Sequence, residues 1–197
     1  MPKVILVDGT DGSGKTTSRN IIRDHYEAMG KQVLTLGFPG HDDFGQHTRP
    51  WFINDSEPEY VKLLAILTEF ARFLENLRKG KYDDYDVIVL DRFILSTAHQ
   101  VNMHPQYVPL VRHFLATYHI DNYLYFITVV RSDYSEQRLS DRAELNKGDI
   151  KAAREKETTN FVTYAKELRL TKSLHVIDNN GDIDTLKATL LTHLDQT

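Results

Sequence analysis

Short hydrophobic runs alternate along this chain with longer segments in which apolar residues recur every three to four positions. The short runs are rich in Val, Ile, Leu and aromatic residues and end at polar residues or glycine, as buried strands do. They predict five strands, at residues 3–7, 32–38, 86–90, 123–130 and 174–177. The longer segments predict five helices, at residues 15–29, 59–78, 105–118, 149–170 and 182–194.

Because strands and helices alternate from one end to the other, the pattern predicts an α/β fold, a five-stranded parallel sheet with helices on both faces. No internal repeat or long linker divides the sequence, so residues 1–197 are expected to form a single domain. In an open parallel sheet, ligands bind beyond the carboxyl ends of the strands. The residues that follow each predicted strand are therefore the first candidates for a functional site.

The composition narrows the chemistry that this site can use. The 197 residues include no cysteine, which excludes a disulfide framework, a thiolate zinc site and a cysteine nucleophile. We expect a cytoplasmic protein without a membrane segment, because the apolar run at residues 4–7 is far too short to span a bilayer. With 24 Lys and Arg against 28 Asp and Glu, the formal charge of -4 argues against a nucleic-acid partner. An anionic small molecule would have to be held by a few local cations.

The segment after the first predicted strand matches G-x-x-x-x-G-K-[ST], the phosphate-binding P-loop, and lies between a strand and a helix as that motif requires. Its residues are Gly9, Thr10, Asp11, Gly12, Ser13, Gly14, Lys15, Thr16 and Thr17. The glycines allow backbone N–H groups to point at an anion, and the N-terminus of the following helix attracts negative charge. We expect Lys15 to contact the β- and γ-phosphates of ATP and the Thr16 hydroxyl to contact Mg²⁺.

A P-loop alone does not distinguish a GTPase from a kinase. Residues 146–149 spell N-K-x-D, the guanine-binding motif of GTPases, but they follow a charged helical segment instead of a buried strand. The D-x-x-G that GTPases place after a strand is also missing, since the third predicted strand is followed by Asp91-Arg92-Phe93. We interpret the match at residues 146–149 as a coincidence.

The remaining motifs, taken in order, resemble those of the thymidylate kinase family over nearly the whole chain. In the first half of the chain the matching residues are Asp11 in the P-loop, Phe38 and Pro39 of the motif F-P-x-R, and Arg72 in the helix at 59–78. The segment 91–100 is similar to D-R-[YFH]-x-x-S-x-A-Y-Q, with one residue fewer. In the second half, Arg138 and Arg142 match the lid motif R-x-x-x-R, and the strand before Asp178 matches as well. Each motif alone is a weak signal. Their shared order on suitable elements carries the resemblance.

The resemblance implies a P-loop nucleotide kinase fold with a short lid near residues 138–150. It implies phosphorylation of a deoxynucleoside 5′-monophosphate by Mg-ATP, with dTMP as the expected acceptor and dTDP as the product. The implied catalytic residues are Asp11, Lys15, Arg92, Arg138 and Arg142. The implied acceptor-binding residues are Asp11, Phe38, Pro39, His41, Arg49, Thr68, Arg72, Arg92, Ser96, His99 and Gln100. A homodimer built on helices is implied as well.

Physical chemistry supports the same set of cations. Phosphoryl transfer between two nucleotides gathers several negative charges, so positive side chains must converge on the site from different elements. Lys15 and Arg92 follow two predicted strands, and the i, i+4 spacing places Arg138 and Arg142 on one face of a helix. Because Gly12 stands where some family members carry a catalytic arginine, the resemblance places that cation in the lid.

Several of these roles have an alternative. Asp91 either contacts Mg²⁺ or caps the next helix, and Asp11 either stabilises the P-loop or binds the acceptor sugar. Arg72 either contacts the base from a buried position, which we favour, or lies at the rim of the site. Arg138 and Arg142 either act in catalysis or belong to a solvated helix surface.

Three positions depart from the family's pattern. His41 replaces the arginine of F-P-x-R, Thr68 replaces the aromatic residue that stacks on thymine, and His99 replaces a tyrosine. A neutral imidazole carries no fixed charge, so either Arg49 supplies the missing cation or Arg92 alone holds the acceptor phosphate. A widened or altered preference among deoxynucleoside monophosphates therefore stays open alongside dTMP.

Two other functions stay open on the sequence alone. A deoxynucleoside kinase would have to deprotonate a 5′-hydroxyl, for which Asp91 is the candidate base. A non-catalytic nucleotide-binding protein of the same fold would bind ATP without releasing ADP.

Overall fold

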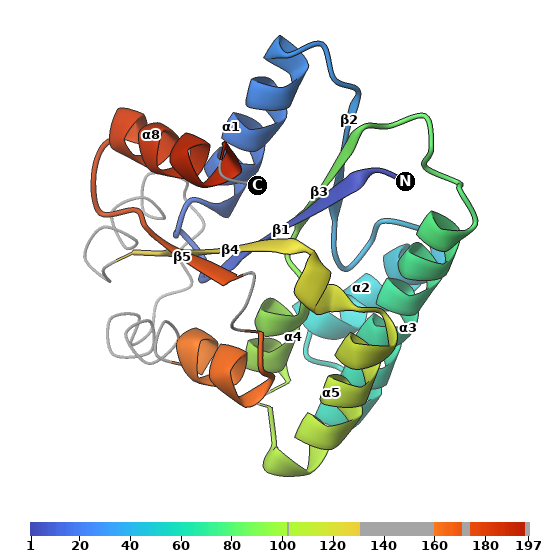
Figure 1. Ribbon diagram of the computed structural model, residues 1–197. Coiled ribbons are helices and arrows are strands. Elements are labelled where there is room, and N and C mark those ends of the chain that lie inside the picture. The colour runs from blue at the N-terminus through green and yellow to red at the C-terminus, as the bar shows by residue number, and fades with distance from the viewer. Residues whose placement is uncertain (102, 131–159, 171–173, 196–197) are drawn as a thin grey trace.

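The computed structural model describes residues 1–101, 103–130, 160–170 and 174–195 (Figure 1). Its centre is a five-stranded sheet in the order β2-β3-β1-β4-β5, in which every pair of neighbours is parallel. The strands are β1 (Lys3–Gly9), β2 (Val33–Gly37), β3 (Val87–Asp91), β4 (Leu124–Val129) and β5 (Leu174–Asp178). The predicted α/β fold is confirmed, with small differences in the bounds of each strand.

β1 lies at the middle of the sheet and is apolar on both of its faces. Leu6 packs into the hydrophobic core on one face, whereas Ile5 and Val7 pack into the core on the other, and all three side chains are fully buried. A strand covered on both faces needs this continuous apolar run. Val7 is in register with Asp91 of β3 and with Phe126 of β4, so the carboxyl ends of the three strands meet at one edge.

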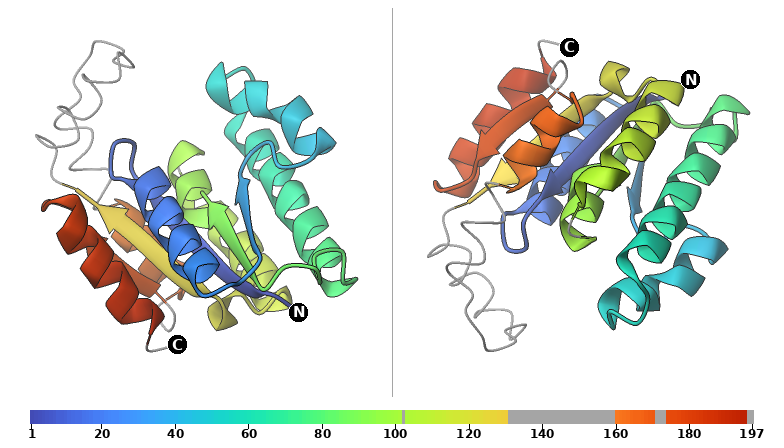
Figure 2. Two further views of the ribbon diagram at one scale, coloured as in Figure 1. Left: turned by 90° about the horizontal axis from the view of Figure 1, so that it is seen from above. Right: turned by 90° about the horizontal axis from the view of Figure 1, so that it is seen from below.

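Helices cover both faces of the sheet (Figures 1 and 2). One face carries α1 (Lys15–Ala28) and α8 (Ile183–Leu194). The other carries α3 (Glu59–Arg78), α4 (Ile94–Gln100), α5 (Val108–Thr117) and the helical residues 160–167. Short 3₁₀ turns at Pro105–Tyr107 and Ile120–Asn122 flank α5. No helix in the described ranges is both long enough and apolar enough to cross a bilayer.

Two helices were not predicted from the sequence. α2 (Asp43–Ile53) packs beside α3 and contains Gly45 and Pro50, residues that disfavour helix interiors. α4 has only seven residues, and most of them are buried, so it lacks the polar face that makes a helix recognisable in a sequence. The helix predicted at 149–170 is described only from residue 160 onward.

Candidate active site

The P-loop follows β1 in a conformation that needs its glycines. Gly9 has φ +150°, and a Cβ at this position would lie 2.4 Å from the carbonyl oxygen of Thr128 on β4. Gly12 and Gly14 have φ values of 76° and 94°, in the left-handed region that only glycine adopts freely. The loop therefore curls tightly over the end of the sheet, as its sequence predicts.

Neighbouring strands hold the P-loop at its far side. The hydroxyl groups of Ser13 and Thr128 are hydrogen-bonded at 2.9 Å, and the Asn179 side-chain amide donates to the Ser13 carbonyl at 2.7 Å. α1 then begins at Lys15 without a side-chain cap from the described residues. Its first N–H groups and its positive dipole end therefore remain available to an anion, which fits the phosphates of ATP. Thr16 is exposed in this first turn, where its hydroxyl fits a contact with Mg²⁺.

Lys15 is a buried cation inside the loop. Its side chain is only 7% exposed, and Nζ donates to the carbonyl oxygen of Thr10 at 2.6 Å and lies 3.4 Å from Oδ1 of Asp11. Burial lowers the pKa of Lys15, and the nearby charge of Arg92 lowers it further. The loop thus holds a lysine whose charge the nearby Asp11 compensates only in part, so a bound phosphate would stabilise it further.

Arg92 follows β3 and reaches the same carboxylate. One of its terminal nitrogens donates to Oδ1 of Asp11 at 2.5 Å. Burial alone would raise the pKa of Asp11, but the charges of Arg92 and Lys15 and their hydrogen bonds outweigh it and lower the pKa to about 2. Asp11 is therefore ionised at neutral pH and contacts both cations. The predicted gathering of Lys15 and Arg92 at one sheet edge is confirmed.

Asp91 is engaged by a residue that the sequence did not single out. Arg19 of α1 contacts its carboxylate at 3.2 Å. Asp91 does not cap α4, because the N–H groups at the start of that helix donate to Asp8 instead. The capping alternative for Asp91 is thus wrong, because the Asp8 carboxylate of β1 accepts the hydrogen bonds of these N–H groups.

Asp8 was likewise not predicted as a functional residue from the sequence. Its position, a charged residue at the end of an apolar strand, is the signal that could have identified it. It is fully buried and accepts hydrogen bonds from the N–H groups of Phe93 and Leu95 at 3.2 and 3.1 Å and from the Tyr125 hydroxyl at 2.5 Å. The Ser96 hydroxyl donates to the other carboxylate oxygen. Buried carboxylates need such donors.

A cavity of about 290 Å³ opens beside the P-loop. It is lined by Gly9, Thr10, Asp11, Arg92, Ser96, His99 and Phe161. The rings of His99 and Phe161 lie 5.7 Å apart, which places a residue of the helix at 160–167 opposite α4. Four predicted acceptor-binding residues therefore line one cavity. Phe161 was not predicted, because nothing in its local sequence links it to α4.

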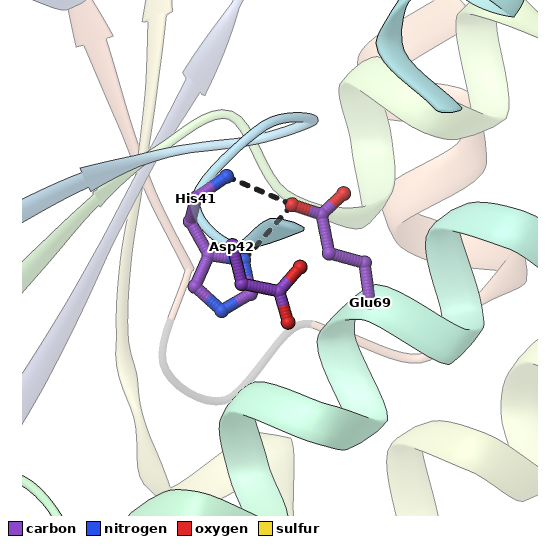
Figure 3. Close-up of side chains that lie close together, drawn as sticks. All are labelled: His41, Asp42 and Glu69. Atoms are coloured by element: carbon purple, nitrogen blue, oxygen red, sulfur yellow. Dashed lines mark hydrogen bonds and ion pairs between the residues drawn. The ribbon is translucent and has the colours of Figure 1, made fainter. Parts of the chain in front are cut away.

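The turn after β2 buries the side chain of His41. The Phe38–Pro39 peptide bond is cis, and the His41 side chain, 3% exposed, packs on the Phe38 ring with centroids 4.5 Å apart. Oε1 of Glu69 on α3 accepts hydrogen bonds from the N–H groups of Gly40 and His41 and contacts Nδ1 of His41 at 2.9 Å (Figure 3). His41 is thus an anchor for this turn.

His41, Asp42 and Glu69 lie close enough together to be considered as a metal site. Asp42 accepts from Gly45 N–H at 2.9 Å and from Arg72 Nε at 2.7 Å, and Nδ1 of His41 contacts Oε1 of Glu69, whereas Oε2 of Glu69 and Nε2 of His41 are buried without a hydrogen-bond partner among the described residues. Nε2 of His41 lies on the side of the ring away from Glu69 (Figure 3). The cluster therefore fits a hydrogen-bonded anchor better than a metal centre.

The other predicted acceptor residues occupy different surroundings. Arg72 is 50% exposed and is paired with Asp42, so the favoured prediction of a buried position is wrong. Thr68 is exposed, and its hydroxyl donates to the carbonyl of Leu64. Arg49 of α2 is exposed and packs on Gly40, where a Cβ would lie 3.3 Å from its Cδ.

Some predicted features lie outside the described residues. These are the lid at 138–150 with Arg138 and Arg142, and the N-K-x-D match at 146–149. Gln100 ends α4, and its side chain is likewise outside the description.

Comparison with known proteins places this site in a family. The family model described as thymidylate kinase matches residues 7–190. The thymidylate kinase of Exiguobacterium sibiricum is 27% identical over 197 aligned residues, which cover 94% of this chain and 91% of that protein. That of Mycoplasma capricolum subsp. capricolum is 27% identical over 193 residues, covering 91% and 88%. The crystal structure of thymidylate kinase from Ehrlichia chaffeensis shares the fold, with a TM-score of 0.69, 18% identity and 98% coverage of each chain. The match runs from the end of β1 into α8, and the chain belongs to the thymidylate kinase family.

Proposed function

We propose that this protein transfers the γ-phosphoryl group of Mg-ATP to dTMP and so forms dTDP and ADP. The observation that carries the proposal is the convergence of Lys15 and Arg92 on Asp11 beside an uncapped helix N-terminus. Two cations, one at the start of α1 and one directly after β3, at one phosphate-binding loop suit a reaction between two anionic nucleotides.

The donor nucleotide is assigned to the P-loop. Residues 9–17 surround its β- and γ-phosphates with backbone N–H groups, and Lys15 supplies the positive charge. Mg²⁺, when bound, neutralises charge on the same phosphates, and the Thr16 hydroxyl would hold it, with Asp91 nearby as a further oxygen ligand once Arg19 is displaced.

Asp11 has two successive roles in this proposal. Without nucleotide it neutralises Lys15 and Arg92, which keeps two close cations from repelling each other. When phosphates arrive they take over both cations, and the exposed Asp11 carboxylate becomes free to accept a hydrogen bond from the acceptor sugar. The same side chain therefore stabilises the loop and binds substrate.

The acceptor is assigned to the cavity between the P-loop, α4 and Phe161, with Arg92 directed at its phosphate and His99 at its nucleoside. The turn at Phe38 and Pro39 follows β2, the strand beside β3, and brings Arg49 toward the same edge of the sheet. Thr68, Arg72 and Gln100 remain candidates for base contacts at its outer side.

The transfer step needs no general base. A phosphate oxygen of the acceptor forms the new bond to the γ-phosphorus, while the bond from that phosphorus to the bridging oxygen breaks and ADP leaves with the electron pair. The acceptor oxygen is already deprotonated at neutral pH. Lys15, Arg92 and the predicted lid arginines Arg138 and Arg142 balance the charge that the transition state spreads over the phosphates.

The contacts of Asp91, the candidate base of a deoxynucleoside kinase, and of its neighbour Asp8 disfavour that alternative. Such an enzyme needs a free base to deprotonate a 5′-hydroxyl. Asp91 is paired with Arg19, and Asp8 accepts four hydrogen bonds. Both carboxylates are therefore occupied by other donors and do not offer the free base that this reaction needs.

A coupled ADP-release assay with each of the four deoxynucleoside monophosphates, UMP and free thymidine tests the function. We expect turnover with dTMP and none with thymidine. Turnover with thymidine would support the nucleoside kinase, and ATP binding without ADP release for any acceptor would support a non-catalytic protein.

We propose further that the protein is a cytoplasmic homodimer. Tyr60, Val61 and Leu64 expose apolar surface along one side of α3, which supports a helix-based interface. Sedimentation equilibrium should give a mass near twice that of the 22.8 kDa chain, and a monomer mass at micromolar concentration would contradict the proposal.

A further inference from the structure

The turn that presents Arg92 to the P-loop is attached to β1 on both sides of that residue. The Arg92 N–H donates to the Val7 carbonyl at 2.9 Å, and the next N–H, of Phe93, donates to the Asp8 carboxylate at 3.2 Å. Between these two bonds Arg92 has φ +70°, in the left-handed region, which is unfavourable for a residue with a side chain. Such a conformation persists only where neighbouring contacts hold it.

Asp8 supplies the side-chain contacts that hold this turn. Besides Phe93 it accepts hydrogen bonds from the N–H group of Leu95 and from the hydroxyl groups of Ser96 and Tyr125. Phe93, Leu95 and Ser96 belong to the turn and to the first residues of α4. The Asp8 carboxylate of β1 therefore acts as the N-terminal cap of this helix.

The charge of Asp8 matters as well as its shape. All four partners donate hydrogen bonds, and an ionised carboxylate is acceptor-only, whereas an amide has two N–H donors at one end. The side-chain NH₂ group of an asparagine at this buried position would therefore face at least one N–H or O–H donor of the turn, and neither donor would have an acceptor. The turn would relax toward ordinary backbone angles and carry the guanidinium of Arg92 away from Asp11.

We infer that Asp8 is a positioning residue that holds Arg92 in its left-handed conformation and thereby aims its guanidinium at the acceptor phosphate. The inference rests on the proposed function for the identity of the acceptor. Asp8 lies beneath the turn and acts on the substrate through the position of Arg92.

A double-mutant cycle tests this role. Asp8→Asn should lower kcat/KM for dTMP roughly 10–100-fold, because a displaced positioning group misaligns the reacting phosphates. The KM for ATP should stay within about twofold of the wild-type value, since the P-loop is held by β4 and Asn179 instead. In an Arg92→Ala background the same Asp8→Asn change should cost less than about threefold, because Asp8 acts through Arg92.

Tyr125→Phe is the milder second variant. It removes one donor to Asp8 and keeps the ring, so it should fold and reduce kcat/KM in the same Arg92-dependent way, by a smaller factor. Ile5→Val, on the same strand and equally buried but facing the opposite core, is the control for general destabilisation and should leave dTMP kinetics unchanged. A crystal structure of Asp8→Asn should show residue 92 outside the left-handed region.

Equal losses with and without Arg92 would overturn the inference, as would an Asp8→Asn structure in which Arg92 keeps φ near +70° and its contact with Asp11. Failure of the proposed function is a different result, because there the wild-type protein itself would release no ADP with dTMP and calorimetry would detect no dTMP binding.

Discussion

The guanidinium of Arg92 donates a hydrogen bond to the carboxylate of Asp11 across 2.5 Å, and this contact joins the end of β3 to the P-loop of β1. The two residues are 81 positions apart in the chain, yet their strands are neighbours in the sheet. Because Asp11 also contacts Lys15, the donor and acceptor sides of the proposed reaction share one carboxylate.

Lys15→Met should abolish phosphoryl transfer and at the same time stabilise the free protein. Burial lowers the pKa of Lys15, so the folded state binds this proton less well than the unfolded state does, and stability rises with pH toward the ordinary value of 10.5. Removing the charge should raise Tm by roughly 2–4 °C for each kcal/mol gained in the free energy of unfolding. The gain over wild type should shrink as the pH approaches 10.5.

Thermal melts at several pH values measure the effect, with Lys31→Met as the matched control, since Lys31 is an exposed partner of Asp86. A lower Tm for Lys15→Met than for wild type at neutral pH, or retained transfer, would contradict this prediction.

Arg49→Gln should weaken the binding of dTMP but not of thymidine. His41 is buried against Glu69, and Arg49 forms no ion pair within the described part of the chain, so its charge is available for the acceptor phosphate. Losing a charge-assisted hydrogen bond should raise the dissociation constant of dTMP about tenfold. Titration calorimetry with both ligands separates a phosphate contact from a general change in the site.

Arg23→Gln is the control for Arg49, because Arg23 lies on α1 and pairs with Asp24 at the surface. If Arg49→Gln weakens thymidine and dTMP equally, Arg49 shapes the site without contacting the phosphate.

Gly45→Ala should destabilise the protein although alanine favours helices. A Cβ at Gly45 would lie 2.0 Å from Oε1 of Glu69, an atom fixed by donors from Gly40 and His41. Overpacking of this kind costs about 1–3 kcal/mol, more than the ~1 kcal/mol that alanine gains over glycine in a helix. Gly37→Ala, with no atom within 4 Å of the new Cβ, should be nearly neutral. Urea denaturation of both variants measures the change in stability. Equal unfolding midpoints for the two variants would contradict the predicted crowding at Glu69.

Arg138→Ala and Arg142→Ala should each lower kcat by far more than they change the KM for dTMP. A lid cation acts mainly on the charge of the transition state, so its removal appears in kcat. Steady-state kinetics with dTMP as the varied substrate measures both constants. Unchanged turnover in both variants would remove the lid arginines from the mechanism.

The sequence by itself determined the fold class and the phosphate-binding loop. Alternating apolar runs and amphipathic segments depend on residues close together in the chain, so the five strands and most helices could be predicted from it. The P-loop is equally local, because its glycine angles and its lysine lie within nine consecutive residues. The predicted meeting of Lys15 and Arg92 followed from the rule that parallel strands end at one edge.

Only the tertiary structure decided which partner each polar side chain takes. Asp8 caps a helix whose Ser96 is 88 positions away, Asp91 pairs with Arg19 at a separation of 72, and His41 meets Glu69 at 28. Such pairings depend on how elements from distant parts of the chain pack, and burial then makes each polar group depend on the partners that this packing brings to it. No pattern of neighbouring residues carries that information, which is why the sequence could not predict that the His41 side chain would be buried against Glu69.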